Sequence, residues 1–174
     1  IIFSSFIYNI NGYINGVMYS ELAGRQGVNS EVVSTLYGEY SVYFLTIINI
    51  PLTLAGAAPT SMIPEVSALY AQHRRKAARR KIDEATQLSM FISIPAAVGL
   101  AVLAYPITRL LFPNTNGTAG TLLLIGAVTI IFNTNSNVSN GVLQGIGKAN
   151  LPMWNAAIAL VINVGLLVAL LQLT

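Results

Sequence analysis

Long apolar runs separated by short polar segments dominate this 174-residue chain. Five stretches contain no charged side chain and are mostly Ile, Leu, Val, Ala and Phe: 1–20, 40–64, 85–108, 110–147 and 149–174. A bilayer core about 30 Å thick is crossed by about 20 apolar helical residues. The pattern therefore predicts an all-α, polytopic integral membrane helical bundle with five transmembrane helices. We expect one transmembrane unit over 1–174, with spans at about 2–21, 37–69, 84–104, 119–143 and 152–172.

Amide side chains interrupt two of these expected spans. Polar residues recur at steps of three or four in the first span, and four Asn fall within eight residues of the fourth. The steps of three or four place the polar residues of the first span on one face of a helix. Amides inside a bilayer either hydrogen-bond between helices or line a hydrated path, and both interpretations stay open. The cavity-lining candidates are Tyr8, Asn11, Asn15, Asn133, Asn137 and Asn140.

The second expected span is too long for a straight perpendicular crossing, and it contains three prolines around the small-residue patch Ala55–Ala58. Proline removes a backbone donor and kinks a helix, while small residues let helices approach closely. We therefore expect a bent helix that packs tightly at its middle and projects past the membrane. The third span also contains a proline. The gate or hinge candidates are Pro51, Gly56, Pro59, Pro64 and Pro95.

Charge adds an orientation to this picture. Charged residues make up only 9% of the chain, against roughly 25% in an ordinary soluble domain. Six of the nine Lys and Arg residues lie in one expected loop, 73–82: Arg74, Arg75, Lys76, Arg79, Arg80 and Lys81. The positive-inside bias makes this loop cytoplasmic, with 22–36 and 105–118 outside and Lys148 inside. The loop either sets topology and touches anionic headgroups, or gathers a pyrophosphate-bearing lipid substrate.

Residues suited to enzyme chemistry are scarce. The chain has no cysteine, and its single histidine, His73, lies beside the basic run. No carboxylate pair lies at membrane depth, and no phosphate-cradling loop or metal-ligand spacing occurs. We therefore expect no catalytic residue, metal or cofactor, and no nucleic-acid partner, since the basic residues are confined to one segment. The chain starts inside an apolar run without Met, so we expect a fragment of a longer polytopic protein, and its partner would be the remainder of that chain.

Several blocks of the sequence resemble the polysaccharide biosynthesis flippases of the multidrug/oligosaccharidyl-lipid/polysaccharide exporter superfamily. The similar branch is the stage V sporulation protein B-like group, whose members are relatives of the lipid II flippases. The blocks that carry the resemblance are YGEYSVYFLTIINIPLTLAGAAPTSMIPEVSALYA, the basic run, ISIPAAVGLAVLAYPITRLLFP and NGVLQGIGKANLP. Where relatives often carry an acidic residue in the first of these helices, this chain has Asn11 or Asn15.

The resemblance implies a transporter of two lobes around a central cavity, with this chain forming part of the second lobe. Such a protein moves a lipid-linked oligosaccharide or peptidoglycan precursor across the bacterial cytoplasmic membrane by alternating access, in cell-wall synthesis or sporulation. Its partners would be membrane lipids and the lipid-linked sugar. Two alternatives remain: a cation-coupled multidrug exporter of the same superfamily, and a membrane-embedded glycosyl- or acyltransferase.

Overall fold

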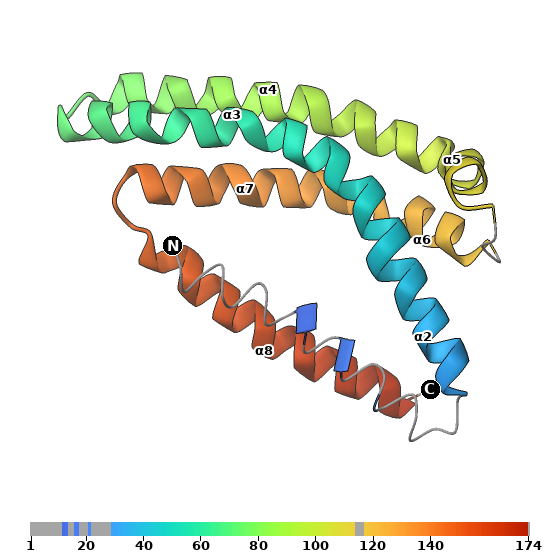
Figure 1. Ribbon diagram of the computed structural model, residues 1–174. Helices are drawn as coiled ribbons and strands as arrows, with labels where there is room; N and C mark the ends of the chain where they lie inside the picture. Colours follow the sequence, from blue (N-terminus) through green and yellow to red (C-terminus); the bar gives the residue numbers. More distant parts are fainter. Residues whose placement is uncertain (1–11, 14–15, 18–20, 22–28, 114–116, 174) are drawn as a thin grey trace. The chain divides into compact units, whose positions relative to one another are not determined.

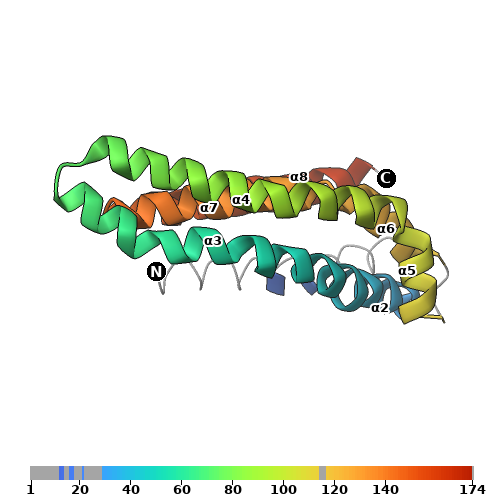
Figure 2. The same cartoon turned by 90° about the horizontal axis from the view of Figure 1, so that it is seen from above.

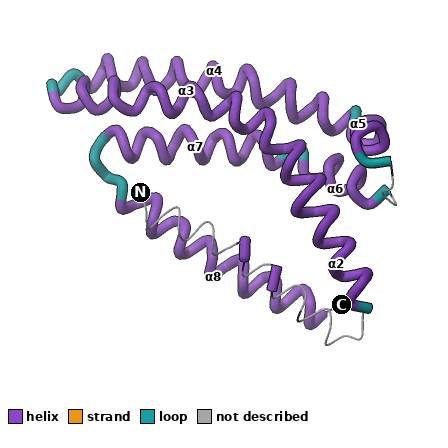
Figure 3. Tube along the Cα trace, viewed as in Figure 1, coloured by secondary structure: helices purple, strands orange, loops and turns teal. Residues whose placement is uncertain are grey.

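The computed structural model describes residues 12–13, 16–17, 21, 29–113 and 117–173 (Figure 1). Every regular element in these ranges is a helix, and they contain no strand (Figure 3), which confirms the all-α class. The chain divides into a central unit, Glu39–Lys148, and a terminal unit made of Ile1–Gly38 with Ala149–Thr174. The expected first span lies almost entirely outside the described residues, as do Tyr8, Asn11 and Asn15.

Two described helical stretches are long and apolar enough to cross a membrane, Glu31–Ala71 and Arg75–Val102. Helices α6 (Thr118–Gly126) and α7 (Thr129–Gly145) make a third if the pair, bent by 47°, is counted as one span. These apolar helices fit an integral membrane bundle.

The central unit is built on three helices that lie side by side. A π-helical turn, η1 (Glu39–Phe44), leads into α3 (Leu45–Ala71), and α4 (Arg75–Val102) returns antiparallel to it. Figure 1 and Figure 2 both show α7 running along this hairpin. The short α5 (Ala104–Leu111) crosses the far end of α4 in Figure 2 and packs on α6. The chain therefore reverses direction twice along this three-helix body, between α3 and α4 at one end and through α5 and α6 at the other.

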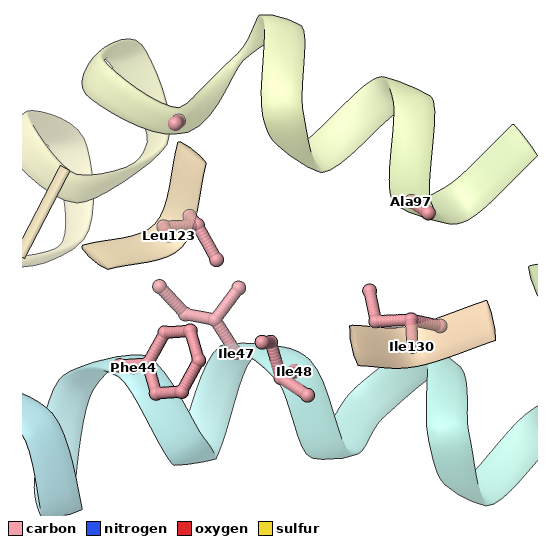
Figure 4. Close-up of a cluster of buried hydrophobic side chains, with 7 residues drawn as sticks. Phe44, Ile47, Ile48, Ala97, Leu123 and Ile130 are labelled. Atoms are coloured by element: carbon pink, nitrogen blue, oxygen red, sulfur yellow. The ribbon is translucent and has the colours of Figure 1, made fainter. Parts of the chain in front are cut away.

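Two apolar clusters hold this body together. One, at the α5–α6 end, contains Phe44, Ile47, Ile48, Ala97, Ala104, Leu123 and Ile130 (Figure 4). The other, towards the α3–α4 turn, contains Met62, Val66, Ala85 and Val138. Because lipid tails are as apolar as these side chains, close packing supplies most of the attraction between membrane helices.

A hydroxyl compensates for one of the three prolines inside α3. Pro59 has no N–H, so the carbonyl of Ala55, four residues earlier, has lost its helical donor. Ser89 of α4 donates its Oγ hydrogen to that Ala55 oxygen at 2.9 Å, and both residues are fully buried. Figure 1 shows that α3 changes direction along its length without a break. The proline is tolerated because a neighbouring helix replaces the lost hydrogen bond.

The basic run is helical, so the prediction of a loop over 73–82 is wrong. Only Gln72–Arg74 connect α3 to α4, and α4 begins at Arg75. Lys, Arg and Ala have high helix propensities. Buried Ala78 and Ala85, with half-buried Ile82 between them, also fall at the spacing of one helix face. These properties favour extending the apolar helix through its charged first turns.

The fourth span is divided near Gly126, before the change in polarity at Asn133 that suggested a division. Here the backbone hydrogen bonds change from four-residue to three-residue spacing. The Ile130 N–H donates to the Ala127 carbonyl at 3.1 Å, and the Ile131 N–H donates to the Val128 carbonyl at 3.2 Å. Thr129 Oγ1 donates to the Gly126 oxygen at 2.6 Å. The Phe44 ring lies where a Gly126 Cβ would be. The bend thus follows from a glycine under an aromatic ring and a local hydroxyl cap.

The terminal unit contains α2 (Ser30–Gly38) and α8 (Asn150–Leu173). Asn29 caps α2, since its Oδ1 accepts the Glu31 N–H at 3.0 Å, and Glu31 complements the positive helix N-terminus. The Tyr37 hydroxyl donates to the Gly12 carbonyl at 3.3 Å and lies against Gly16. Helix α8 is apolar over Asn150–Leu166.

Candidate functional site

Helix α7 has a packed face and an amide face. Its buried residues follow a three-to-four spacing and lie against α3 and α4: Ile130, Thr134, Val138, Gly141 and Gly145. Asn133 and Asn137 are exposed, and Asn140 is half-buried. At about 100° per residue, these amides lie roughly a quarter of a turn from the packed face. The sequence spacing thus groups the three candidates on one side of α7.

The amide face does not hold the described helices together. Asn133 Nδ2 donates to the Thr129 carbonyl of its own helix at 3.0 Å. Within the described ranges, none of Asn133, Asn137 and Asn140 bonds to α3 or α4. Half-buried Gln144 continues the same row one turn further on and was missed from the sequence, although its spacing of four from Asn140 was a sufficient signal.

Close contact between α3 and α7 depends on glycines of α7. A Cβ added to Gly145 would lie 3.1 Å from Val66 Cγ1 and 3.3 Å from the Ile63 oxygen. One added to Gly141 would lie 3.3 Å from the Pro59 oxygen. Gly56, expected at the tight contact, is instead open, since an added Cβ meets no described atom within 4 Å. On a helix, residue 56 points about 100° away from buried Ala55, and this places it off the seam.

The proline candidates differ in their surroundings. Pro51 and Pro59 are buried, whereas Pro64 and Pro95 are exposed. Two neighbouring helices contact the turn that contains Pro59. Ser89 of α4 donates a hydrogen bond to the Ala55 carbonyl, and Gly141 of α7 lies close to the Pro59 oxygen. Their role as a gate or hinge remains a prediction.

Glu39 was not singled out from the sequence. It begins the π-helical turn, is only 4% exposed, and its Oε2 has no hydrogen-bond partner among the described residues. π-Helical turns are frequent at functional sites. Glu39 follows Gly38 and directly precedes the uncharged stretch 40–64. That position was the available signal, but next to so long an apolar run it looked like the end of the membrane span.

The α3–α4 turn carries the charged groups. His73 adopts a positive φ of 57° there. Arg80 pairs with Glu84 at 3.1 Å, and Lys81 pairs with both Glu65 and Glu84 at 3.2 Å. The Arg75 guanidinium lies 5.9 Å from the centre of the Tyr70 ring. Glu65 thus takes part in an exposed charge network at the end of the hairpin. In the part of the chain that the structure describes, no group of three or more His, Asp or Glu residues could hold a metal ion.

Comparison with known proteins identifies the family. The family described as lipid II flippase MurJ matches residues 2–174. The chain is 28% identical to the lipid II flippase MurJ of Bacillus subtilis over 157 residues, which cover 87% of this chain and 28% of that protein. It is 20% identical to stage V sporulation protein B of the same organism over 167 residues, covering 96% of this chain and 32% of the relative.

A probable lipid II flippase MurJ of Rhizobium meliloti is 29% identical over 109 residues, which are 60% of this chain and 20% of that protein. No solved structure matches the chain. The chain spans about a third or less of these relatives. The flippase resemblance is therefore confirmed, and the match over nearly the whole sequence shows that this chain belongs to the lipid II flippase MurJ family.

Proposed function

We propose that the full-length protein containing this chain moves a lipid-linked cell-wall or polysaccharide precursor across the bacterial cytoplasmic membrane by alternating access. The observation that carries this proposal is the family match over residues 2–174. Flippases of this family are transporters rather than enzymes. In this proposal the central unit moves as a packed body, because its helices are joined by glycine contacts and a buried hydrogen bond.

The amide row of α7 is assigned to the substrate path. Asn133, Asn137, Asn140 and Gln144 lie beside the α3–α7 contact and do not bond to α3 or α4 among the described residues. Polar side chains in a membrane helix are costly unless they meet water or polar partners. A hydrated cavity accounts for their spacing and would pass a sugar headgroup without a charged site.

The test is movement of a fluorescent lipid-linked sugar in vesicles that contain the full-length protein. Replacing the paired amides, Asn137→Leu with Asn140→Leu, should lower the flipping rate at least about tenfold, the effect of 1.4 kcal/mol on a barrier. Asn135→Leu is the matched control, since Asn135 is exposed on α7 but lies roughly 140–180° around the helix from the amide row. Equal rates in both variants and the unchanged protein would reject this path.

The superfamily alternative is a cation-coupled multidrug exporter. Under that alternative, the same vesicles would accumulate a cationic dye when an ion gradient is applied and leave the lipid-linked sugar unmoved. For a glycosyl- or acyltransferase, the diagnostic result would be a covalently changed lipid rather than a translocated one.

A further inference from the structure

The basic residues at the start of α4 fall into two groups. Arg80 and Lys81 are neutralised by Glu84 and Glu65. Arg75, Lys76 and Arg79 make no ion pair within the described ranges, although Asp83 lies one turn beyond Arg79 on the same helix. Of these three, Arg75 and Arg79 lie four residues apart and share one helix face. Two guanidinium groups separated by one helical turn thus keep their charge available on one face.

A pocket opens beside these two arginines. It is lined by Tyr70 at the end of α3, by one face of α4, and by Ile146 just after α7. The α4 face contributes Arg75, Ala78, Arg79 and Ile82 at the three-to-four helical spacing. The lining therefore combines two guanidinium groups with the apolar side chains of Ala78, Ile82 and Ile146.

The pocket's size limits what it can hold. Its volume is about 270 Å³, at the low end of small-molecule sites, which start near 300 Å³. A single phosphate-bearing headgroup fits this volume, whereas a lipid-linked disaccharide with its pyrophosphate is larger than the space. The apolar part of this lining would contact the glycerol and first methylenes of a lipid, contacts that a free phosphate ion lacks.

We propose that this pocket binds the phosphate of one anionic phospholipid headgroup at the membrane surface. Arg75 and Arg79 supply the forked N–H donors that match phosphate oxygens, and Tyr70 holds the Arg75 guanidinium by a cation–π contact. The site joins the ends of α3, α4 and α7, so a bound lipid ties the central unit to the leaflet. It is separate from the amide row and does not depend on the transported substrate.

The experiment is native mass spectrometry of the full-length protein titrated with phosphatidylglycerol or phosphatidylcholine. We expect one tightly bound phosphatidylglycerol, with binding at least tenfold weaker in the Arg75→Gln, Arg79→Gln double variant. The matched control is Lys76→Gln with Arg80→Gln, which removes two charges from the same run but lines no part of the pocket; its binding should change less than threefold. Ile146→Trp fills the pocket without removing charge and should also weaken binding.

Equal losses in the two double variants would overturn the proposal, because they would indicate diffuse attraction to the basic run. Equal binding of the two lipids would also overturn it. Displacement of the lipid by equimolar inorganic phosphate would show a free-anion site and reject the lipid assignment. Circular dichroism and thermal melting of each variant are to be measured as a check that it is folded. Flipping of the lipid-linked sugar, measured in parallel, separates this site from the proposed transport function, since either can fail while the other holds.

Discussion

At the residue scale, small side chains determine how closely α7 approaches α3. The sequence predicted that small residues would provide close helix contacts, but it favoured the patch around Gly56. Ala55 in that patch is fully buried, whereas Gly56 beside it faces open space. Composition cannot separate the two, because only the direction of each position on the helix decides which one meets a neighbour. The tight positions, Gly141 and Gly145, lie instead in a helix noted for its asparagines.

The first prediction contrasts two glycines. Gly145→Leu should destabilise the full-length protein by about 1–3 kcal/mol, since the new side chain overlaps Val66 and the Ile63 carbonyl. Gly56→Leu should leave stability within about 0.5 kcal/mol, as surface changes usually do. Unfolding by SDS in mixed micelles measures both. A Gly56→Leu variant as unstable as Gly145→Leu would place Gly56 at a tight contact after all.

At the element scale, α3 and α4 form a hairpin in which Ser89 of α4 donates a hydrogen bond to the α3 carbonyl that Pro59 leaves without a donor. The prolines were visible in the sequence and predicted a helix in need of compensation. Ser89 lies 34 residues after Ala55 and could not be recognised in the sequence as the compensating group. Which carbonyl its hydroxyl meets depends on the register of two packed helices. The basic first turns of α4 and the bend near Gly126 were misplaced for a related reason. Propensity and local hydroxyl bonds overrode the changes in polarity used to set boundaries.

The second prediction is a double-mutant cycle on that pair. Ser89→Ala alone should cost about 0.5–2 kcal/mol, because it leaves the Ala55 carbonyl buried without a donor. In a Pro59→Ala background the restored N–H supplies a donor, so the same change should cost much less. The coupling between the two positions is the quantity measured, again by SDS unfolding.

Ser93→Ala serves as the control for this cycle. Ser93 is equally buried, but its Oγ contacts Met90 Sδ of its own helix at 3.7 Å. Its cost should be independent of Pro59. Additive costs for Ser89→Ala and Pro59→Ala would contradict the compensation.

At the scale of the whole molecule, the three-helix body has two chemically different ends. The pocket that includes Tyr70, Arg75 and Ile146 brings the basic run and the residues before Lys148 to one end. The 28 residues of α4 extend about 42 Å, longer than a bilayer core of about 30 Å. The α4–α5 junction therefore lies at the opposite end. From charge alone, the sequence predicted that the basic run and Lys148 lie on the same side of the membrane.

The third prediction concerns orientation. In a cysteine-free full-length background, Ala77→Cys and Lys148→Cys should react with a membrane-impermeant thiol reagent only after the cells are permeabilised. Pro113→Cys, in the turn after α5, should react in intact cells. The basis is the cluster of six Lys and Arg residues, because the positive-inside bias keeps such a cluster on the cytoplasmic side of the membrane. Opposite labelling of Ala77→Cys and Lys148→Cys would contradict their placement at the same end.

The hydrogen bond from Ser89 to Ala55 also bears on how the chain enters the bilayer during synthesis. Until α4 emerges, the Ala55 carbonyl of α3 has neither the Pro59 donor nor the Ser89 hydroxyl. An unsatisfied carbonyl in hydrocarbon costs several kcal/mol. Lateral release of α3 alone is thus disfavoured, and release together with α4 as a pre-formed hairpin is favoured. The three-residue connection at Gln72–Arg74 keeps the two helices adjacent, so a hairpin released as one unit can enter the bilayer with the Ser89–Ala55 hydrogen bond already made.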